Sequence, residues 1–395
     1  MKILSINDLQ QIGGASKASK RIADALGDLG NQIITVSSDG INGKNHKTLF
    51  LGRKFEILTS LLPKFVPNIV LQKIRNSELE KQFCSILKSE KPDIINVHNL
   101  HCASWPLSLV RVALDFAPVV WTLHDCYSFS GRFCPSHTPP PEKLFLNEIN
   151  NFWNKLKRNP NAQLLAATAP SNWINLQCKK SNWDNRLVQT IKNPVPDTFN
   201  MYKNRTSCKK VLGLKEGVTT ILFISGNLGA RHKGNWIIEE IVTAASEKNI
   251  QFLLIGNNSL QAFNSKKVVN LNFIQDEITL KIAYNAADLL IHPAPIDNLP
   301  NTVAESMSCG TPVLAFKTGG LPEMVISGKS GWLTSDISSD AIIKDFFQII
   351  ESADLKELRS STVKLASNFF DQNKIANEYS NLFRKLTSKS CKKSN

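Results

Sequence analysis

Two carboxylates in the C-terminal half of the chain, Asp297 and Glu305, flank the start of one predicted helix with seven residues between them. They belong to residues 288–325, which run from an apolar strand through a Pro-rich turn and the helix to a second strand and a paired-glycine turn. Open α/β sheets bind ligands at the carboxyl ends of their strands, where carboxylates accept hydrogen bonds from hydroxyl groups. These residue types suit a polyhydroxylated ligand, and they do not suit a nucleophile or a metal cage.

Cations and glycines near the same predicted edge suit an anion. Arg231 and Lys233 follow a predicted strand over 219–225 and the loop that begins at Gly226, and they precede a predicted helix. The start of a helix binds phosphate, and cations beside it can neutralise a departing pyrophosphate. The paired glycines that begin at Gly319 would let the backbone approach such a ligand closely. The alternatives are a solvated loop for the basic residues and ordinary turn or capping chemistry for the acids and glycines.

The N-terminal half carries two further candidates. His124 ends a predicted strand over 118–124, where its imidazole could contact a sugar hydroxyl or move a proton. A buried structural histidine is the alternative at this position. Gly13 and Gly14 lie between the first predicted strand and the first predicted helix, where an anion could rest on the helix end; taken alone, they indicate only a tight turn.

A metal site is the other reading of the N-terminal half. Histidines and cysteines crowd into one short region, at His98, His101, Cys102, His124, Cys126, Cys134 and His137. Their spacings are not those of compact structural zinc sites, so we expect no metal. The eight cysteines of the chain are scattered, which favours free thiols. The chain also lacks a GxSxG nucleophile elbow and the GxGxxG and P-loop phosphate motifs.

The elements that position these residues alternate between strand and helix, and the pattern occurs twice. Such alternation predicts two α/β domains with doubly wound parallel sheets. A stiff Asn-Pro-Val-Pro linker at 193–196 separates them, so we expect domains at 1–195 and 196–370. A final helix, 371–388, places Ile375, Tyr379, Phe383 and Leu386 on one apolar face.

Composition limits the classes of protein and partner. The 395 residues are 42% hydrophobic and 20% charged, as in globular proteins, and no apolar run is long enough to span a bilayer. The N-terminus lacks the features of a signal peptide, so we expect a cytoplasmic protein. The net charge of +14 favours either general solubility or an anionic partner such as phosphate or a membrane surface. Nucleic acid is disfavoured because no nucleic-acid-binding motif is present.

Several segments together resemble a known family. The stretch DNLPNTVAESMSCGTPVLAFKTGGLPEMV is similar to the donor-site signature of family 4 retaining glycosyltransferases of the GT-B fold. The resemblance extends to IGGASKASKRIADALGDLG, VVWTLHD, PSNW and RHKG, and so covers nearly the whole chain. It implies two Rossmann-like domains that face an inter-domain cleft, with the last helix crossing back to the first domain. These motifs are most similar to those of members that build bacterial exopolysaccharide, capsule or lipopolysaccharide.

The resemblance also implies roles for individual residues. Glu305 would hold the ribose hydroxyls, Asp297 the transferred sugar, and Lys233 with Arg231 the diphosphate. His124 would contact the donor sugar near the reacting carbon. The remaining donor-binding positions would be Gly13, Gly14, Gly226, Asn298, Leu299, Asn301 and Thr302. Two departures stand out: Asp297 occupies a position that is usually Glu, and Asn227 one that is often Arg.

The implied activity is transfer of a sugar from a nucleotide-diphosphate donor to a hydroxyl of a glycan or lipid-linked acceptor, with retained anomeric configuration. No cofactor or metal is expected, because cations and helix ends would serve the leaving group. Residues 53–81 and 152–158 mix apolar and basic side chains, as helices at an anionic membrane surface do; helices packed on the core are the alternative. A nucleotide-sugar epimerase and a non-catalytic sugar-nucleotide-binding protein remain as rival functions. The base, sugar, acceptor and linkage stay open.

Overall fold

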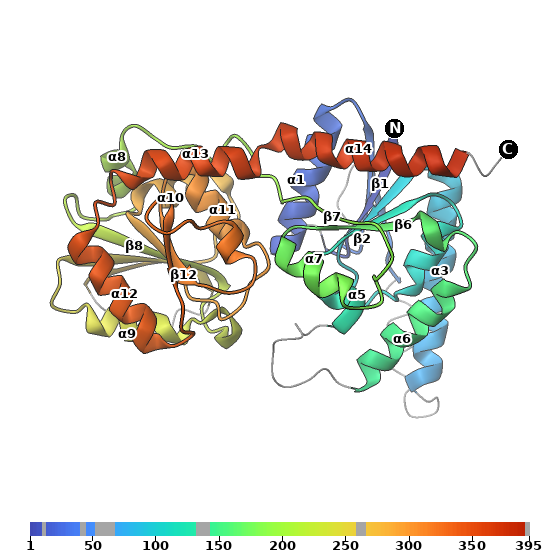
Figure 1. The fold of residues 1–395 in the computed structure, drawn as a ribbon, viewed down its shortest axis with the longest axis horizontal. Coiled ribbons are helices and arrows are strands. Elements are labelled where there is room, and N and C mark those ends of the chain that lie inside the picture. The colour runs from blue at the N-terminus through green and yellow to red at the C-terminus, as the bar shows by residue number, and fades with distance from the viewer. Residues whose placement is uncertain (10–12, 40–44, 52–67, 132–142, 258–265, 392–395) are drawn as a thin grey trace. The chain divides into compact units, whose positions relative to one another are not determined.

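A computed structural model describes residues 1–9, 13–39, 45–51, 68–131, 143–257 and 266–391 (Figure 1). The chain divides into two compact units, Met1–Ile191 with Asn373–Asn395, and Lys192–Gln372. The expected boundary after residue 195 lies four residues later than the observed one. Ile191 is buried in the first unit, whereas the backbone N–H of Val195 donates to the carbonyl of Phe370 in the second, at 3.1 Å. The linker therefore belongs to the second unit.

The first unit is built on a seven-stranded, fully parallel sheet in the order β3-β2-β1-β4-β5-β6-β7. Its strands are β1 (Lys2–Ile6), β2 (Gln32–Ser37), β3 (His46–Thr48), β4 (Ile94–Val97), β5 (Val119–Thr122), β6 (Leu165–Ala169) and β7 (Val188–Thr190). Its helices are α1 (Gly14–Asp28), α3 (Asn68–Glu90), α4 (Ser108–Leu114), α5 (Tyr127–Ser130), α6 (Lys143–Lys157), α7 (Asn172–Lys179) and α14 (Gln372–Cys391). The strand order reverses between β1 and β4, and such a switch point is where doubly wound sheets bind ligands.

The last helix packs on this first sheet (Figure 1). Ile375, Tyr379, Phe383 and Leu386 share one buried cluster with residues of β1, α1, β4, β5 and β6. The Tyr379 hydroxyl lies 3.2 Å from the Thr168 hydroxyl, which satisfies a polar group inside an apolar layer. The face predicted from helical spacing is the one that the structure buries.

The second unit repeats the plan with a six-stranded parallel sheet in the order β10-β9-β8-β11-β12-β13. Its strands are β8 (Thr219–Asn227), β9 (Ile250–Asn257), β10 (Val268–Leu271), β11 (Leu289–His292), β12 (Val313–Phe316) and β13 (Gly331–Thr334). Its helices are α8 (Arg205–Val211), α9 (Trp236–Ala244), α10 (Glu277–Ala286), α11 (Asn301–Ser308), α12 (Ser339–Ser352) and α13 (Leu358–Phe370), with short 3-10 turns at Arg231–Lys233 and Leu321–Glu323. The switch point lies between β8 and β11.

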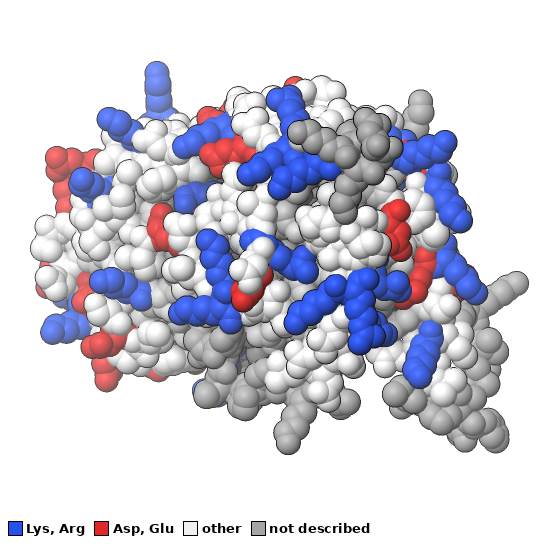
Figure 2. Space-filling view, turned by 45° about the vertical axis from the view of Figure 1, so that its right-hand side comes forward, with Lys and Arg blue, Asp and Glu red and all other residues white. Residues whose placement is uncertain are grey.

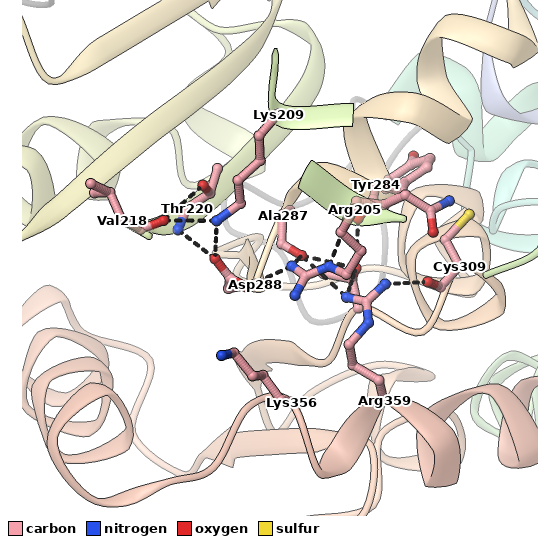
Figure 3. A network of polar contacts seen from close by, with 12 residues as sticks. Arg205, Lys209, Val218, Thr220, Tyr284, Ala287, Asp288, Cys309, Lys356 and Arg359 are labelled. Atoms are coloured by element: carbon pink, nitrogen blue, oxygen red, sulfur yellow. Dashed lines mark hydrogen bonds and ion pairs between the residues drawn. The ribbon is translucent and has the colours of Figure 1, made fainter. Parts of the chain in front are cut away.

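A buried ionic network ties the amino edge of this second sheet to the helices beside it. Figure 3 shows Arg205 and Lys209 of α8 converging on Asp288, directly before β11, at 2.5 and 2.9 Å. The neighbouring Arg359 of α13 is 6% exposed and donates to the Cys309 carbonyl at 2.8 Å. Burial lowers the pKa of Arg359 to about 10, and the guanidinium stays charged at neutral pH. The network has a structural role, because its charged side chains are bonded to other groups of the protein.

Surface features bear on the expected membrane partner. Figure 2 shows Lys and Arg side chains in several groups on one face, with fewer Asp and Glu side chains among them. Within 152–158, however, the apolar side chains Phe152, Trp153 and Leu156 are buried in the core of the first unit, which is the alternative arrangement. Residues 53–67 of the other candidate segment lie outside the described residues. Among the described helices, none has the length and apolar character needed to cross a bilayer.

Candidate active site

Lys233 and Asp297 meet at the switch point of the second sheet. Lys233 ends the 3-10 turn that follows β8, and Asp297 lies in the loop that follows β11. Lys233 Nζ donates to Asp297 Oδ2 at 2.8 Å, although the residues are 64 positions apart in the chain. Neighbouring parallel strands end at the same edge, so the two loops are forced together. The lysine side chain is 39% exposed and the aspartate side chain 16% exposed, so the pair reaches solvent mainly through its cation.

Two glycines make this approach of the loops possible. A Cβ atom on Gly234, where φ is +73°, would lie 1.7 Å from the carbonyl oxygen of Pro293. A Cβ on Gly319, where φ is +58°, would lie 1.9 Å from the carbonyl oxygen of Asp297. The next amide, that of Gly320, donates to this same Asp297 oxygen at 3.0 Å. Only glycine fits both the left-handed backbone and the close contact, so the glycines after β8 and β12 fix the position of the ion pair.

Asp297 is held as a carboxylate. Burial alone would raise its pKa, but the nearby charge of Lys233 and the proximity of His292 hold the pKa well below its ordinary value. His292 Nε2 lies 3.3 Å from Asp297 Oδ2 without the alignment of a hydrogen bond. The other oxygen, Oδ1, accepts from the amide of Asn298 at 2.9 Å. At neutral pH this group can accept hydrogen bonds from hydroxyls, and it has no proton to give.

Glu305 is placed on α11, the helix that follows Asp297. It is 2% exposed, and its Oε2 accepts a hydrogen bond from the Tyr284 hydroxyl at 2.8 Å. No side chain caps this helix, whose N-cap is Pro300. Neither Tyr284 nor His292 is among the candidates from the sequence. His292 could have been found as the polar residue that ends β11, whereas nothing local marks Tyr284.

The other candidates of the second unit fall in three environments. Asn298, Asn301 and Thr302 are half-buried around the start of α11. Leu299 is 6% exposed and packs in the core, so only its backbone could face a ligand. Gly226 is exposed at the end of β8. Arg231 is exposed, and it forms no salt bridge with any residue that the structure describes, so it does not share the contact between Lys233 and Asp297.

The glycine pair of the first unit begins its first helix. Gly13 is the N-cap of α1 with φ +102°, and Gly14 is the first helical residue. Both are exposed, no side chain caps the helix, and its first turn contains no acidic residue. The start of a helix is a place where proteins bind anions, and Gly13 and Gly14 lie at such a start.

His124 forms part of a histidine pair after β5. Its Nε2 lies 2.9 Å from Nδ1 of the buried His98, so one ring donates and the other accepts. Burial, and then the charge of His101, lower the pKa of His124 to about 4, and burial likewise lowers the pKa of His98. Both rings are therefore neutral at pH 7, and His98 holds the orientation of His124.

The described part of this region contains no cluster suited to a metal. No group of three or more His, Cys, Asp or Glu side chains that could hold an ion occurs among the described residues. Cys134 and His137 lie outside them. Six cysteines, Cys102 and Cys126 among them, form no disulfide in the described structure.

A buried acid that is not among the candidates from the sequence lies at the switch point of the first sheet. Asp8, after β1, is 1% exposed, and its Oδ2 accepts from the amide of Ala103 at 3.0 Å. The Asp8 amide donates to the carbonyl of Asn99 at 2.9 Å. These bonds join the loops after β1 and β4. The polar pair Asn7-Asp8 at the end of an apolar strand was the available signal.

The chain is similar in sequence to known proteins. Residues 219–352, which include Lys233, Asp297 and Glu305, match the family described as glycosyl transferases group 1. N-acetyl-alpha-D-glucosaminyl L-malate synthase of Bacillus anthracis is 20% identical over 84% of this chain and 89% of its own length. Lipopolysaccharide 1,2-N-acetylglucosaminetransferase of Salmonella typhimurium is 23% identical over 66% of this chain and 78% of its own.

A solved structure shows the same fold over the full chain. The Anabaena protein HepE, in complex with UDP-glucose, superposes with a TM-score of 0.71 over 98% of this chain and all of its own, at 18% identity. Two parallel-sheet domains and this likeness identify the architecture as GT-B. The chain therefore has the GT-B fold, and its residues 219–352 match the family described as glycosyl transferases group 1.

Proposed function

We propose that the chain transfers a sugar from a nucleotide-diphosphate donor to a hydroxyl of a glycan or lipid-linked acceptor, with retention, in the synthesis of a cell-surface polysaccharide. The observation that carries the proposal is the ion pair of Lys233 and Asp297 at the switch point of the second sheet. The known complex of HepE with UDP-glucose and the names of the relatives, two of which transfer N-acetylglucosamine, support a nucleotide-sugar donor.

In this proposal each residue of the second unit has one task. Asp297 accepts hydrogen bonds from the transferred sugar, and Glu305, oriented by the Tyr284 hydroxyl, accepts them from the ribose. Lys233 and the exposed Arg231 neutralise the diphosphate as charge develops on it. Backbone groups from Asn298 to Thr302 and at Gly226 complete the donor pocket. Gly13, Gly14 and His124 of the first unit act on the phosphates and the donor sugar.

The way in which Asp297 is held argues against a covalent intermediate on this carboxylate. A carboxylate whose pKa is strongly lowered, and whose two oxygens already accept from Lys233 and the Asn298 amide, is a poor nucleophile. We therefore propose that the acceptor hydroxyl attacks on the face that the leaving diphosphate vacates. The cations supply the leaving-group stabilisation, so we propose no divalent metal and no cofactor. Transfer should continue in EDTA, and loss of activity restored by Mg²⁺ would contradict this point.

A nucleotide panel tests the proposal. The full chain is heated with UDP, GDP or ADP, and one of them should raise the melting temperature, because a ligand that binds only the folded state stabilises it. Incubation of the corresponding nucleotide sugar with and without acceptors then separates transfer from isomerisation of the donor. No thermal shift with any nucleoside diphosphate would refute donor binding, and an isomerised sugar without transfer would identify an epimerase.

Two observations support a membrane surface as a partner. Val70 and Ile74 lie four residues apart on α3 and are 39% and 50% exposed, and the chain carries a net charge of +14. We propose that this apolar ridge and the basic balance favour anionic lipid. The chain should sediment with anionic vesicles at low salt more than with neutral ones, and equal sedimentation would end the idea.

A further inference from the structure

A cavity of about 610 Å³ lies within the first unit, and all of its described lining residues belong to that unit. Its walls are one face of α3, one face of α6, and the loop that leads from β4 into α4. Its volume is in the range of small-molecule sites. Nothing in the proposed donor chemistry uses this cavity.

The walls of the cavity are held by hydrogen bonds to backbone carbonyls. The Arg75 guanidinium of α3 donates to the carbonyls of Ala103 and Ser104 at 2.8 and 2.6 Å. The Trp153 indole of α6 donates to the carbonyl of Ser128 at 2.9 Å. Both helices are thereby fixed to the segments that follow the strands, and the cavity is a built feature of the unit.

One end of the cavity touches the histidine cluster. His101 and Tyr127 line it, with ring centroids 4.8 Å apart. His101 Nε2 lies 3.5 Å from Asp125 Oδ2, and Asp125 directly follows His124. The cavity therefore begins beside the residue expected at the reacting carbon, at the carboxyl edge where such sheets bind ligands.

The chemistry of the lining suits a sugar. Four side-chain amides, which both donate and accept, line the two helical walls: Gln72, Asn76, Asn147 and Asn151. Trp105, Tyr127 and Phe152 are 2%, 8% and 7% exposed, and they form an apolar floor. Amides around aromatic rings can bind the hydroxyls and the apolar face of a carbohydrate together.

The charges of the lining suit an acid group on that sugar. Lys73, Arg111 and Lys155 line the cavity, against a single carboxylate, Glu148. None of the three cations forms a salt bridge with a described residue, in contrast to Lys233. A site with more cations than acids, with amides between them, selects an anionic polyhydroxylated ligand.

We propose that this cavity is the acceptor subsite and that the acceptor is a sugar bearing a phosphate or carboxylate, with its hydroxyl toward His101 and its acid group among Lys73, Arg111 and Lys155. The inference rests on the proposed function, since it names the acceptor class for that reaction. One relative is a synthase named for L-malate, and two others are glycosyltransferases named for D-inositol 3-phosphate; each of these compounds carries an acid group.

Calorimetry on the full chain tests the inference. Glucose 6-phosphate and glucuronate should each bind at least about tenfold more tightly than glucose, since hydrogen bonds to charged groups are worth more than neutral ones. Arg111→Gln and Lys155→Gln should each weaken the binding of glucose 6-phosphate about tenfold or more and leave the affinity for glucose unchanged. Glu148→Gln should tighten the binding of glucose 6-phosphate, because it removes the negative charge that repels the phosphate.

Lys157→Gln is the matched control. Lys157 belongs to α6 and is exposed, but it does not line the cavity, so its loss should change binding by less than about twofold. Equal affinity for glucose and glucose 6-phosphate, or equal losses in the control and cavity variants, would overturn the inference.

The donor assay separates this outcome from failure of the proposed function. If the chain binds a nucleoside diphosphate but transfers sugar only to neutral acceptors, the proposed function stands and the inference about the acceptor is wrong. Transfer assays with glucose 6-phosphate and with a sugar diphosphate on a short isoprenoid then show whether the acid group belongs to a free sugar or to a lipid carrier. Transfer to either one supports the inference.

Discussion

The two aspartates at the ends of β11 have opposite surroundings. Asp288, at the amino end, accepts from Arg205, Lys209 and the Thr220 amide at 2.5, 2.9 and 2.8 Å. Asp297, beyond the carboxyl end, has Lys233 at 2.8 Å and His292 at 3.3 Å. Both carboxylates have a lowered pKa despite burial that opposes the shift.

The two sites differ in how far their cations are exposed to solvent, where a ligand could contact them. Around Asp288 the Arg205 and Lys209 side chains are 19% and 11% exposed, and their charges join α8 to β8 and β11. Beside Asp297 the Lys233 side chain is 39% exposed. One strand thus has a carboxylate that holds elements together at one end and a carboxylate that can exchange partners with a ligand at the other. A lowered pKa alone does not separate the two roles.

The largest expected effect is loss of the structural carboxylate. Asp288→Asn leaves the buried Lys209 and the half-buried Arg205 without their anion, and breaking a buried pair costs about 3–5 kcal/mol. We expect the free energy of unfolding, measured with urea, to fall by about that amount. Asp336→Asn, at an exposed position of the same unit, should change it by less than about 0.5 kcal/mol. A similar small change for both variants would remove the structural role of Asp288.

Loss of the cation at the other end should affect turnover instead. Lys233→Ala should lower kcat about 10²- to 10³-fold, as loss of one group that stabilises developing negative charge does. The melting temperature should fall less than in Asp288→Asn, because the Lys233 side chain is 39% exposed and exposed ion pairs contribute little to stability. The control is Lys248→Ala, which breaks the exposed pair with Glu351 that has the same 2.8 Å length. Near-normal transfer by Lys233→Ala would exclude Lys233 from the mechanism.

The smallest effect is on stability in acid. The folded state holds both aspartates below their ordinary pKa of 3.8, so the unfolded state binds more protons as pH falls below that value. Their contribution is therefore present above about pH 4 and is lost as pH falls further. Unfolding measured from pH 5 to pH 2 should lose stability with a shallower slope in Asp288→Asn and in Asp297→Asn than in the unsubstituted chain. An unchanged slope in either variant would show that its carboxylate is not held ionised by folding.

Much of the fold could be predicted because it depends on local patterns. Apolar runs that alternate with segments of helical periodicity indicate both parallel sheets. The helix predicted after Asp297 is α11, Asn301–Ser308. Strand β13 was not predicted, since its segment, Gly331–Thr334, is short and only partly buried. The helix predicted after Lys233 begins at Trp236, because Gly234 takes a left-handed conformation there.

The sequence predicted several residues of the candidate site, but it did not predict the side chains that contact them. Asp297, Glu305 and Lys233 carry recognisable local signals, whereas Tyr284 and Asp288 resemble any buried tyrosine or surface acid. Leu299 was expected to line the sugar pocket partly through its backbone, and its side chain packs in the core. Contacts between distant elements decide each of these cases.

The amino-acid sequence by itself determined two α/β units, the order of their elements, and a group of acids, cations and glycines after particular strands. The tertiary structure decided which of them meet. Lys233 and Asp297 stand 64 residues apart, and they pair because parallel strands end at one edge and two glycines let their loops touch. Side-chain type is local information, whereas the distance between two loops exists only once the sheet between them has formed.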